Sequence, residues 1–69
     1  MTPTEQDEET LEAIGTYIRD NGFPPSRREL MTLLNLGSPS SAQKRVERLV
    51  ELGWITINKD QPRALRIVK

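Results

Sequence analysis

Apolar residues recur at helical spacing in the first third of the chain. Leu11, Ile14 and Ile18 lie three or four positions apart, which places them on one face of a helix. Thr4 can cap the start of this segment, and Asn21-Gly22 suits its end. The pattern predicts a helix over about residues 4–21.

A second apolar stripe follows a capping signal. Ser26 and Glu29 have the spacing of a capping box, in which each side chain bonds the backbone N–H of the other residue. Leu30, Leu33 and Leu34 then repeat at helical spacing, and Asn35 suits the stop. We expect a helix over about residues 27–35.

The third stretch is polar on one face and apolar on the other. Ser38 can cap it, Pro39 suits the first turn and Gly53 the stop, which predicts a helix over about residues 39–52. Away from its apolar stripe lie several polar and cationic side chains: Ser40, Ser41, Lys44 and Arg48, with Gln43 on the flank. Such a face suits a DNA major groove, but an ordinary amphipathic surface helix has the same pattern.

The period changes from helical to alternating after Gly53. Trp54–Ile57 and Leu65–Val68 are rich in β-branched and aromatic residues, which predicts strands over about 54–58 and 64–68. Their connecting loop carries Lys59 and Arg63. Three helices followed by a hairpin predict an α+β fold, a winged helix-turn-helix, as a single domain over residues 1–69.

The stripes together predict one small core. Its expected members are Leu11, Ile14, Ile18, Phe23, Leu30, Leu33, Leu34, Ala42, Val46, Leu49 and Val50, with Ile55, Ile57, Leu65 and Ile67 from the strands. Trp54 is expected to anchor the hairpin by packing, rather than to stack on bases.

Composition removes most catalytic and metal-binding classes. The 69 residues include no cysteine and no histidine, so they lack thiolate and imidazole nucleophiles, bases and zinc ligands. We expect no enzyme activity, no catalytic residue, no metal site and no cofactor. The sequence also has no apolar run of membrane-spanning length, so we expect a cytoplasmic protein with no membrane partner.

The net charge of zero hides a strong asymmetry. Residues 1–25 hold six acids and one base, a net −5, whereas residues 26–69 hold nine bases and four acids, a net +5. A molecule polarised in this way can turn one face to a polyanion. Cations scattered for solubility are the simpler explanation.

Several motifs at matched spacing carry a family resemblance. Pro24-Pro25-Ser26-Arg27, Glu29-Leu30, Ser38-Pro39 and Gly53-Trp54-Ile55 resemble the N-terminal DNA-binding domain of LexA-type repressors, over about residues 4–69. The resemblance implies double-stranded DNA as the partner and major-groove reading by the third helix. Carried over position by position, it implies base-proximal roles for Ser38, Ser40, Ser41, Gln43 and Lys44, and phosphate contacts from Ser26, Arg27 and the wing.

Two departures from the family pattern matter. The family has an asparagine and two glutamates where this chain has Ser40, Gln43 and Lys44, so the family's operator is not expected. The chain also stops at the wing, without the domain that dimerises and self-cleaves with a serine–lysine pair. Self-cleavage is therefore not expected, and we expect a monomer in solution that dimerises, if at all, on DNA.

Cations outside the third helix's first turns complete the expected DNA surface. Arg27 and Arg28 at a helix start, Arg48, and Lys59 and Arg63 in the wing are candidates for backbone contacts. For Arg27 and Arg28, the alternative to a DNA contact is a role in solubility. For Lys59 and Arg63, the alternative is a solvated loop tip. We therefore expect a sequence-specific transcriptional regulator, a repressor; a winged-helix protein-interaction module, or a modulator of another repressor, is the alternative.

Overall fold

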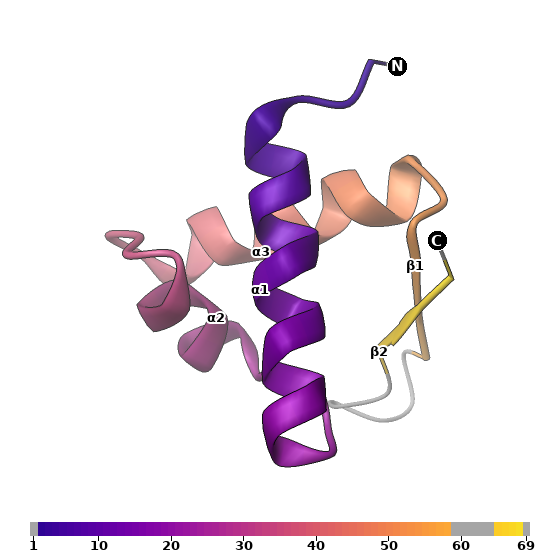
Figure 1. Cartoon of the computed structure of the whole chain (residues 1–69). Helices are drawn as coiled ribbons and strands as arrows, with labels where there is room; N and C mark the ends of the chain where they lie inside the picture. The colour runs from indigo at the N-terminus through magenta and orange to yellow at the C-terminus, as the bar shows by residue number, and fades with distance from the viewer. Residues whose placement is uncertain (1, 59–64, 69) are drawn as a thin grey trace.

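A computed structural model describes residues 2–58 and 65–68 of the chain. The chain forms three helices and a two-stranded hairpin: α1 (Glu5–Asn21), α2 (Arg27–Leu33), α3 (Pro39–Glu51), β1 (Ile55–Ile57) and β2 (Leu65–Ile67). In Figure 1, α1 crosses in front of α3, with α2 on one side of it and the hairpin on the other. The predicted winged helix-turn-helix is confirmed. Across the described residues, none of the helices combines the length and apolar character needed to span a membrane.

Each helix begins at a side-chain cap. Thr4 and Asp7 form a capping box, because Thr4 Oγ1 accepts from the Asp7 N–H and Asp7 Oδ2 accepts from the Thr4 N–H, at 3.3 and 2.8 Å. Ser26 and Glu29 form the predicted second box, at 3.2 and 2.8 Å. Ser38 caps α3 by accepting from a backbone N–H in its first turn. The caps satisfy N–H groups that a helix start leaves unpaired, and so they fix where the helices begin.

Left-handed residues follow the helices. Gly22 has φ +83° and Gly53 has φ +76°, where a side chain would be strained. After α2 the left-handed residue is Asn35, with φ +55°. Because Leu34 has already left helical geometry, α2 ends at Leu33, two residues earlier than predicted. The ends of α1 and α3 agree with the prediction to within one residue.

The core lies where α1 and α2 pack on α3 and the hairpin closes one side. Its buried apolar members are Ile14, Leu30, Ala42, Val46, Leu49, Ile55 and Leu65. All belong to the predicted stripes, which confirms the helical phase of each helix and the inner face of each strand. Burial of one large aliphatic side chain contributes about 1.5–3 kcal/mol to stability, so these few residues account for much of the fold.

Three predicted core residues lie at the surface instead. Phe23, Leu33 and Val50 have 41, 49 and 41% of their area exposed. Phe23 follows the left-handed Gly22 and packs edge-on against the ring of Tyr17, with ring centroids 5.8 Å apart. Leu33 is the last residue of the seven-residue α2 and lines a groove between α1 and α2. Val50 lies at the margin of the α3 stripe. Predicting these three as core was therefore wrong.

The hairpin is shorter than predicted. Among the described residues, Ile55 pairs with Ile67 and Ile57 with Leu65 in an antiparallel ladder, and each strand is three residues long. Trp54 packs against the core. Its backbone N–H donates to the Leu49 carbonyl of α3 at 3.0 Å, and its carbonyl accepts from the backbone N–H of Val68 at 2.7 Å. The predicted packing role of Trp54, which ties the wing to α3, is confirmed.

Candidate nucleic-acid interface

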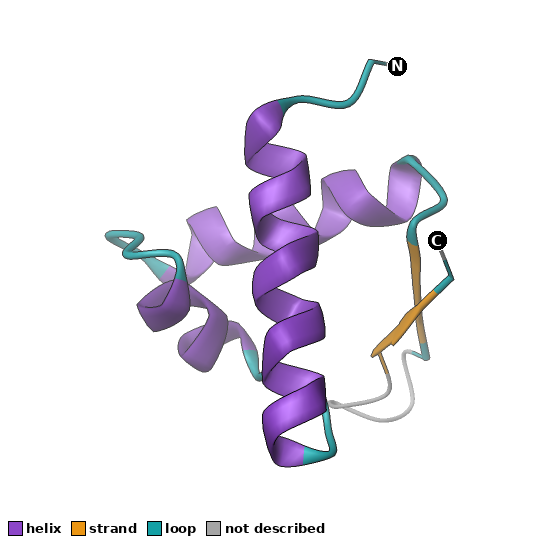
Figure 2. Ribbon diagram, viewed as in Figure 1, coloured by secondary structure: helices purple, strands orange, loops and turns teal. Residues whose placement is uncertain are grey.

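The helix-turn-helix unit is formed by α2, a short turn and α3. Within the turn, Leu36 donates its N–H to the Met31 carbonyl at 2.9 Å and packs against the core. This contact reverses the chain after the left-handed Asn35. As Figure 2 shows, α2 then lies beside the N-terminal half of α3, so both helix starts border the same surface.

The exposed face of α3 carries most of the residues expected near bases. Ser40, Gln43 and Lys44 are exposed, while Ala42 and Val46 point into the core from the other side. The helical period therefore presents short polar, amide and cationic groups along one outward strip. The structure brings these three predicted residues together.

Ser38 and Ser41 are partly occupied with the cap. The Ser41 N–H donates to Ser38 Oγ at 3.4 Å, and the two hydroxyl oxygens are 3.2 Å apart. Both side chains are half-buried. Each hydroxyl can still bond outward, so their predicted base contacts stay predictions.

A shallow groove of about 460 Å³ runs between the start of α2 and the exposed strip of α3. Its lining residues are Arg27, Pro39, Ser40, Gln43, Lys44 and Glu47. Arg27 Nε donates to Gln43 Oε1 at 2.6 Å, and Gln43 Nε2 donates to Glu47 Oε1 at 3.2 Å. Partial burial lowers the pKa of the Arg27 guanidinium, and the charge of Glu47 opposes this shift. The arginine is thus held across the groove by polar contacts with α3.

Glu47 was missed by the sequence reasoning. Its spacing of four from Gln43 is the signal that could have found it, because residues i and i+4 are neighbours on a helix surface. An acid in this position is unexpected beside phosphates. It gives the strip a negative group as well as the cation of Lys44.

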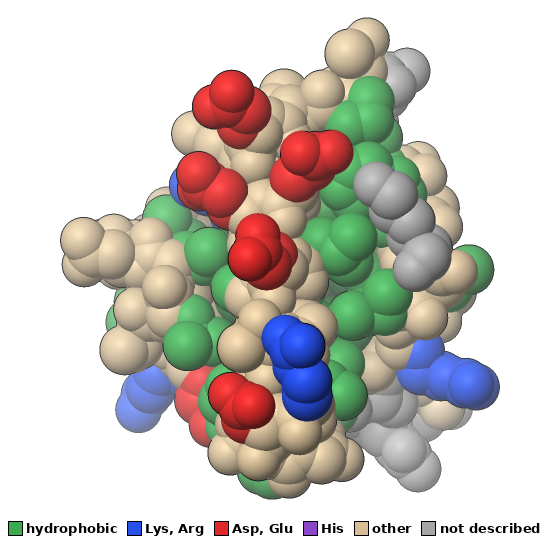
Figure 3. Space-filling model, viewed as in Figure 1, with side chains coloured by type: hydrophobic (Ala, Val, Ile, Leu, Met, Phe, Trp, Pro, Cys, Tyr) green, Lys and Arg blue, Asp and Glu red, His purple; other side chains and the backbone are tan. Residues whose placement is uncertain are grey.

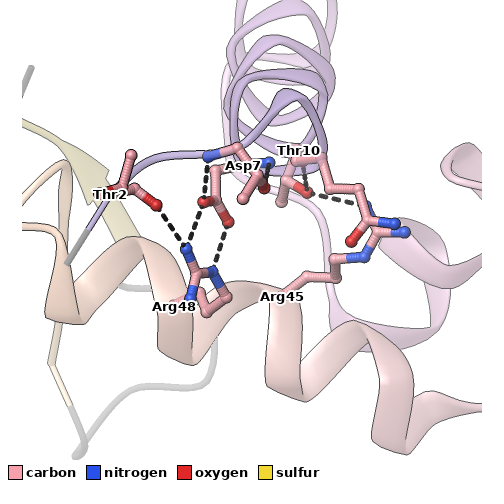
Figure 4. Close-up of polar contacts among 7 residues, drawn as sticks. Thr2, Asp7, Thr10, Arg45 and Arg48 are labelled. Atoms are coloured by element: carbon pink, nitrogen blue, oxygen red, sulfur yellow. Dashed lines mark hydrogen bonds and ion pairs between the residues drawn. The ribbon is translucent and has the colours of Figure 1, made fainter.

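Arg48 makes a different contact from the one expected for it. Its Nε and Nη2 donate to the two carboxylate oxygens of Asp7 at 2.8 and 2.7 Å, and Nη2 also reaches the Thr2 carbonyl at 3.2 Å (Figure 4). Asp7 is 1% exposed. The hydrogen bond from Arg48, with those from Thr4, holds the pKa of Asp7 well below its usual range against the opposing effect of burial.

The helical phase predicts an outward Arg48, but α1 crosses α3 at this point and supplies a carboxylate. Arg45, one turn earlier, similarly extends its guanidinium to Thr10 Oγ1 of α1 at 3.4 Å (Figure 4). The structure therefore places Arg48 in the α1–α3 contact. A phosphate contact from it stays a prediction, and it would have to coexist with the Asp7 pair.

The remaining backbone candidates differ in what the structure says of them. Arg28 is exposed, and Ser26 is half-buried as the cap of α2. Lys59 and Arg63 lie outside the described residues, so their predicted wing contacts stay predictions. Of the residues at the start of α2, Arg27 borders the α3 strip.

The charge asymmetry of the sequence becomes a difference between faces. Figure 3 shows acidic side chains gathered over α1, on the face turned away from α3. These exposed acids are Glu5, Glu8, Glu9, Glu12 and Asp20. An anionic partner is thus repelled by the α1 face.

Comparison with known proteins agrees with this geometry. A family model described as the LexA DNA binding domain matches residues 1–64. The LexA repressor of Bifidobacterium longum (strain DJO10A) is 37% identical over 67 residues, which cover 97% of this chain and 28% of the relative. The LexA repressor of Thermobifida fusca is 36% identical over 66 residues, covering 96% and 26%. That of Carboxydothermus hydrogenoformans is 33% identical over 63 residues, covering 91% and 31%.

The chain spans little more than a quarter of the length of the Bifidobacterium relative. The match is to a DNA-binding region, and it includes all the elements from α1 to β1. With its three helices, its hairpin and this match over most of its length, the chain belongs to the LexA DNA-binding domain family.

Proposed function

We propose that this chain is a sequence-specific double-stranded DNA-binding regulator of transcription, acting as a repressor. The observation that carries the proposal is the exposed polar strip on the N-terminal half of α3, in a domain of a DNA-binding family. A major groove admits an α-helix, and side chains on its first turns reach the base edges. The family's role is regulatory, which supports binding rather than catalysis.

The strip contains two kinds of group with different tasks. Gln43 offers a donor and an acceptor to base edges, and hydroxyls come from Ser40 in the strip and from Ser38 and Ser41 beside it. Lys44 can reach either a base or a phosphate. The serines carry no charge to attract phosphates, so we expect them to contribute to the choice of DNA sequence more than to binding affinity.

Backbone contacts come from outside the strip. Arg28 is exposed in the first turn of α2, and Arg27 lines the groove beside the strip. We extend the proposal to Ser26 at the cap of α2 and to Lys59 and Arg63 in the wing. Phosphate contacts fix the position of a domain on the duplex without reading its sequence.

Assembly is part of the proposal. We expect the domain to be monomeric in solution, because its helices and hairpin share one small core. We expect it to act in the cytoplasm, where bacterial DNA is regulated. Two copies on DNA would bind half-sites about one helical turn, roughly 34–36 Å, apart. Analytical ultracentrifugation at micromolar concentration tests this, and a stable dimer without DNA would contradict it.

Selection from a random duplex pool is the experiment that tests sequence-specific binding. The purified protein should enrich a common short motif, and the enriched duplex should bind more tightly than a scrambled one. Enrichment of no motif by folded protein would contradict the proposal.

A second candidate function rests on a specific feature of the α1–α2 side. A groove of about 570 Å³ has an apolar floor that includes Ala13, Leu33 and Leu34, and it is rimmed by Glu9 and Glu12. The sequence revealed no apolar patch, but the structure leaves Leu33 half exposed here. Charge complementarity favours a basic segment of a partner protein with one apolar anchor.

Leu33→Ser separates the two functions. If repression acts through DNA binding alone, this variant should bind the selected duplex like the wild type and repress a reporter equally. Loss of repression with unchanged DNA binding would instead favour the docking function.

A further inference from the structure

The amide of Gln43 is bonded at both ends by charged side chains. Arg27 Nε donates to its oxygen at 2.6 Å, and its nitrogen donates to Glu47 Oε1 at 3.2 Å. Arg27 comes from α2 and Glu47 from the next turn of α3, so the two partners approach from different elements. Gln43 itself is exposed on the strip.

The chemistry of the two partners fixes which way the amide faces. A guanidinium only donates hydrogen bonds, and a carboxylate only accepts them. The amide oxygen must therefore face Arg27, and the NH₂ group must face Glu47. Turning the amide over would set its NH₂ against the guanidinium and its oxygen against the carboxylate, and both hydrogen bonds would be lost.

One acceptor and one donor remain after these two bonds. An amide oxygen has two lone pairs and an amide nitrogen has two hydrogens. Gln43 therefore keeps one lone pair on its oxygen and one N–H on its nitrogen for a further hydrogen bond. In the major groove, adenine presents an acceptor at N7 beside a donor at N6, which complements that pair. Guanine presents two acceptors, N7 and O6, so its O6 would meet the amide oxygen, which cannot donate to it.

We propose that Arg27 and Glu47 are positioning residues that hold the Gln43 amide in one orientation, so that α3 reads an adenine and rejects a guanine. This inference rests on the proposed DNA-binding function. Arg27 and Glu47 act through Gln43, which alone touches the base.

The position of Glu47 gives the inference a distinctive signature. A carboxylate near phosphates opposes binding, so its removal raises affinity for any sequence. Its removal also releases the amide, so the choice between adenine and guanine weakens. Loss of a merely structural acid would produce the first effect without the second.

Glu51 supplies the matched control. It is an exposed acid one turn after Glu47 on the same helix. Glu51→Ala removes the same charge from α3 without touching Gln43. It should raise affinity for scrambled DNA slightly and leave the choice of base unchanged.

The experiment uses the duplex selected by the wild-type protein and locates the base pair whose preference disappears in Gln43→Ala. That pair should be A·T. Wild-type protein should prefer it over G·C by about 10- to 100-fold, the range of a good two-bond base contact. Replacing the adenine by 7-deazaadenine, which lacks the N7 acceptor, should lower wild-type affinity about 10-fold and leave Gln43→Ala unaffected.

The positioning variants complete the test. Glu47→Ala should reduce the A·T over G·C preference to within about 3-fold while its affinity for scrambled DNA rises. Arg27→Ala should also weaken the preference, and Arg27→Lys, which keeps a donor, should restore part of it. Circular dichroism checks that each variant is folded.

Three outcomes would overturn the inference. A Gln43-dependent pair other than A·T, or an unchanged preference in Glu47→Ala, would refute the positioning role and leave sequence-specific binding intact. Absence of any sequence-dependent binding by folded wild-type protein would overturn the proposed function, and the inference with it.

Discussion

The two sides of α3 use arginine in opposite ways. On the α1 side, Arg48 forms a two-bond ion pair with Asp7, whose carboxylate is 1% exposed and bonded on both oxygens. On the α2 side, Arg27 donates one hydrogen bond to the exposed amide of Gln43, whose nitrogen also donates to Glu47. The first contact joins α1 to α3 through a buried carboxylate, and the second leaves one acceptor and one donor of the Gln43 amide available. Both arginines are half-buried, so the exposure of the partner side chain distinguishes the α1–α3 contact from the candidate reading surface.

The largest expected effect is on the buried side of α3. Leu49→Ala removes a fully buried side chain from the centre of the core and should lower the free energy of unfolding by about 2–5 kcal/mol. Lys44→Ala, on the exposed side, should change it by less than about 0.5 kcal/mol. Urea unfolding of both variants measures the contrast. Equal losses would show that the two sides do not differ as described.

The exposed side should show its effect in DNA binding instead. Gln43→Ala should weaken binding to the selected duplex by about 1–3 kcal/mol and relax choice at one base pair, because it removes both amide bonds to the base. Titration against the site, its single-base variants and scrambled DNA measures this. If affinity falls equally for every sequence while the protein stays folded, Gln43 does not read bases.

The contribution of the Asp7–Arg48 ion pair to stability should depend on pH. Because the folded state lowers the pKa of Asp7 below its ordinary value of 3.8, the pair stabilises the fold above that value, and its contribution is lost as pH falls toward the folded-state pKa. Asp7→Asn keeps an acceptor for the Thr4 N–H but removes the charge. It should be less stable at pH 7 by about 1 kcal/mol, after allowance for solvent screening at the half-exposed arginine.

Thermal melts at pH 7, 4 and 3 measure this prediction. The gap between wild type and Asp7→Asn should narrow on acidification. Glu8→Gln, which removes an exposed acid from the same helix, is the control and should show little gap at any pH. A gap that widens as pH falls would contradict the assigned direction.

These contrasts also explain how far the sequence could predict the molecule. The capping box of Ser26 and Glu29 and the buried stripe of Ala42, Val46 and Leu49 are local patterns, so they were found without the fold. The Asp7–Arg48 pair joins residues 41 positions apart. The helical period of α3 predicts an outward Arg48, because the period contains no information about where another helix crosses α3.

The surface residues show the same limit. Gln43, Lys44 and Ser40 were predicted as exposed from the period of α3, and they are exposed. Glu47 was overlooked, although it bonds Gln43, since an acid does not resemble a DNA contact. Leu33 was assigned to the core from its spacing, but α2 ends at this residue and leaves it half exposed.

The smallest expected effect comes from the wing. Lys59→Ala removes one proposed phosphate contact, so it should weaken selected and scrambled duplexes alike and reduce the salt slope by about one unit. Titration at two salt concentrations measures both quantities. A change in base preference would show that Lys59 reads sequence rather than holding the backbone.

Salt titration of the wild-type protein tests the central claim most directly. Affinities for the selected and the scrambled duplex are measured from about 50 to 200 mM salt, with the folded state checked throughout. Because neutralised phosphates release counterions, both affinities should fall steeply, and the selected duplex should stay the tighter one at every concentration. Affinity that is flat with salt, or equal for both duplexes, would contradict sequence-specific DNA binding by α3.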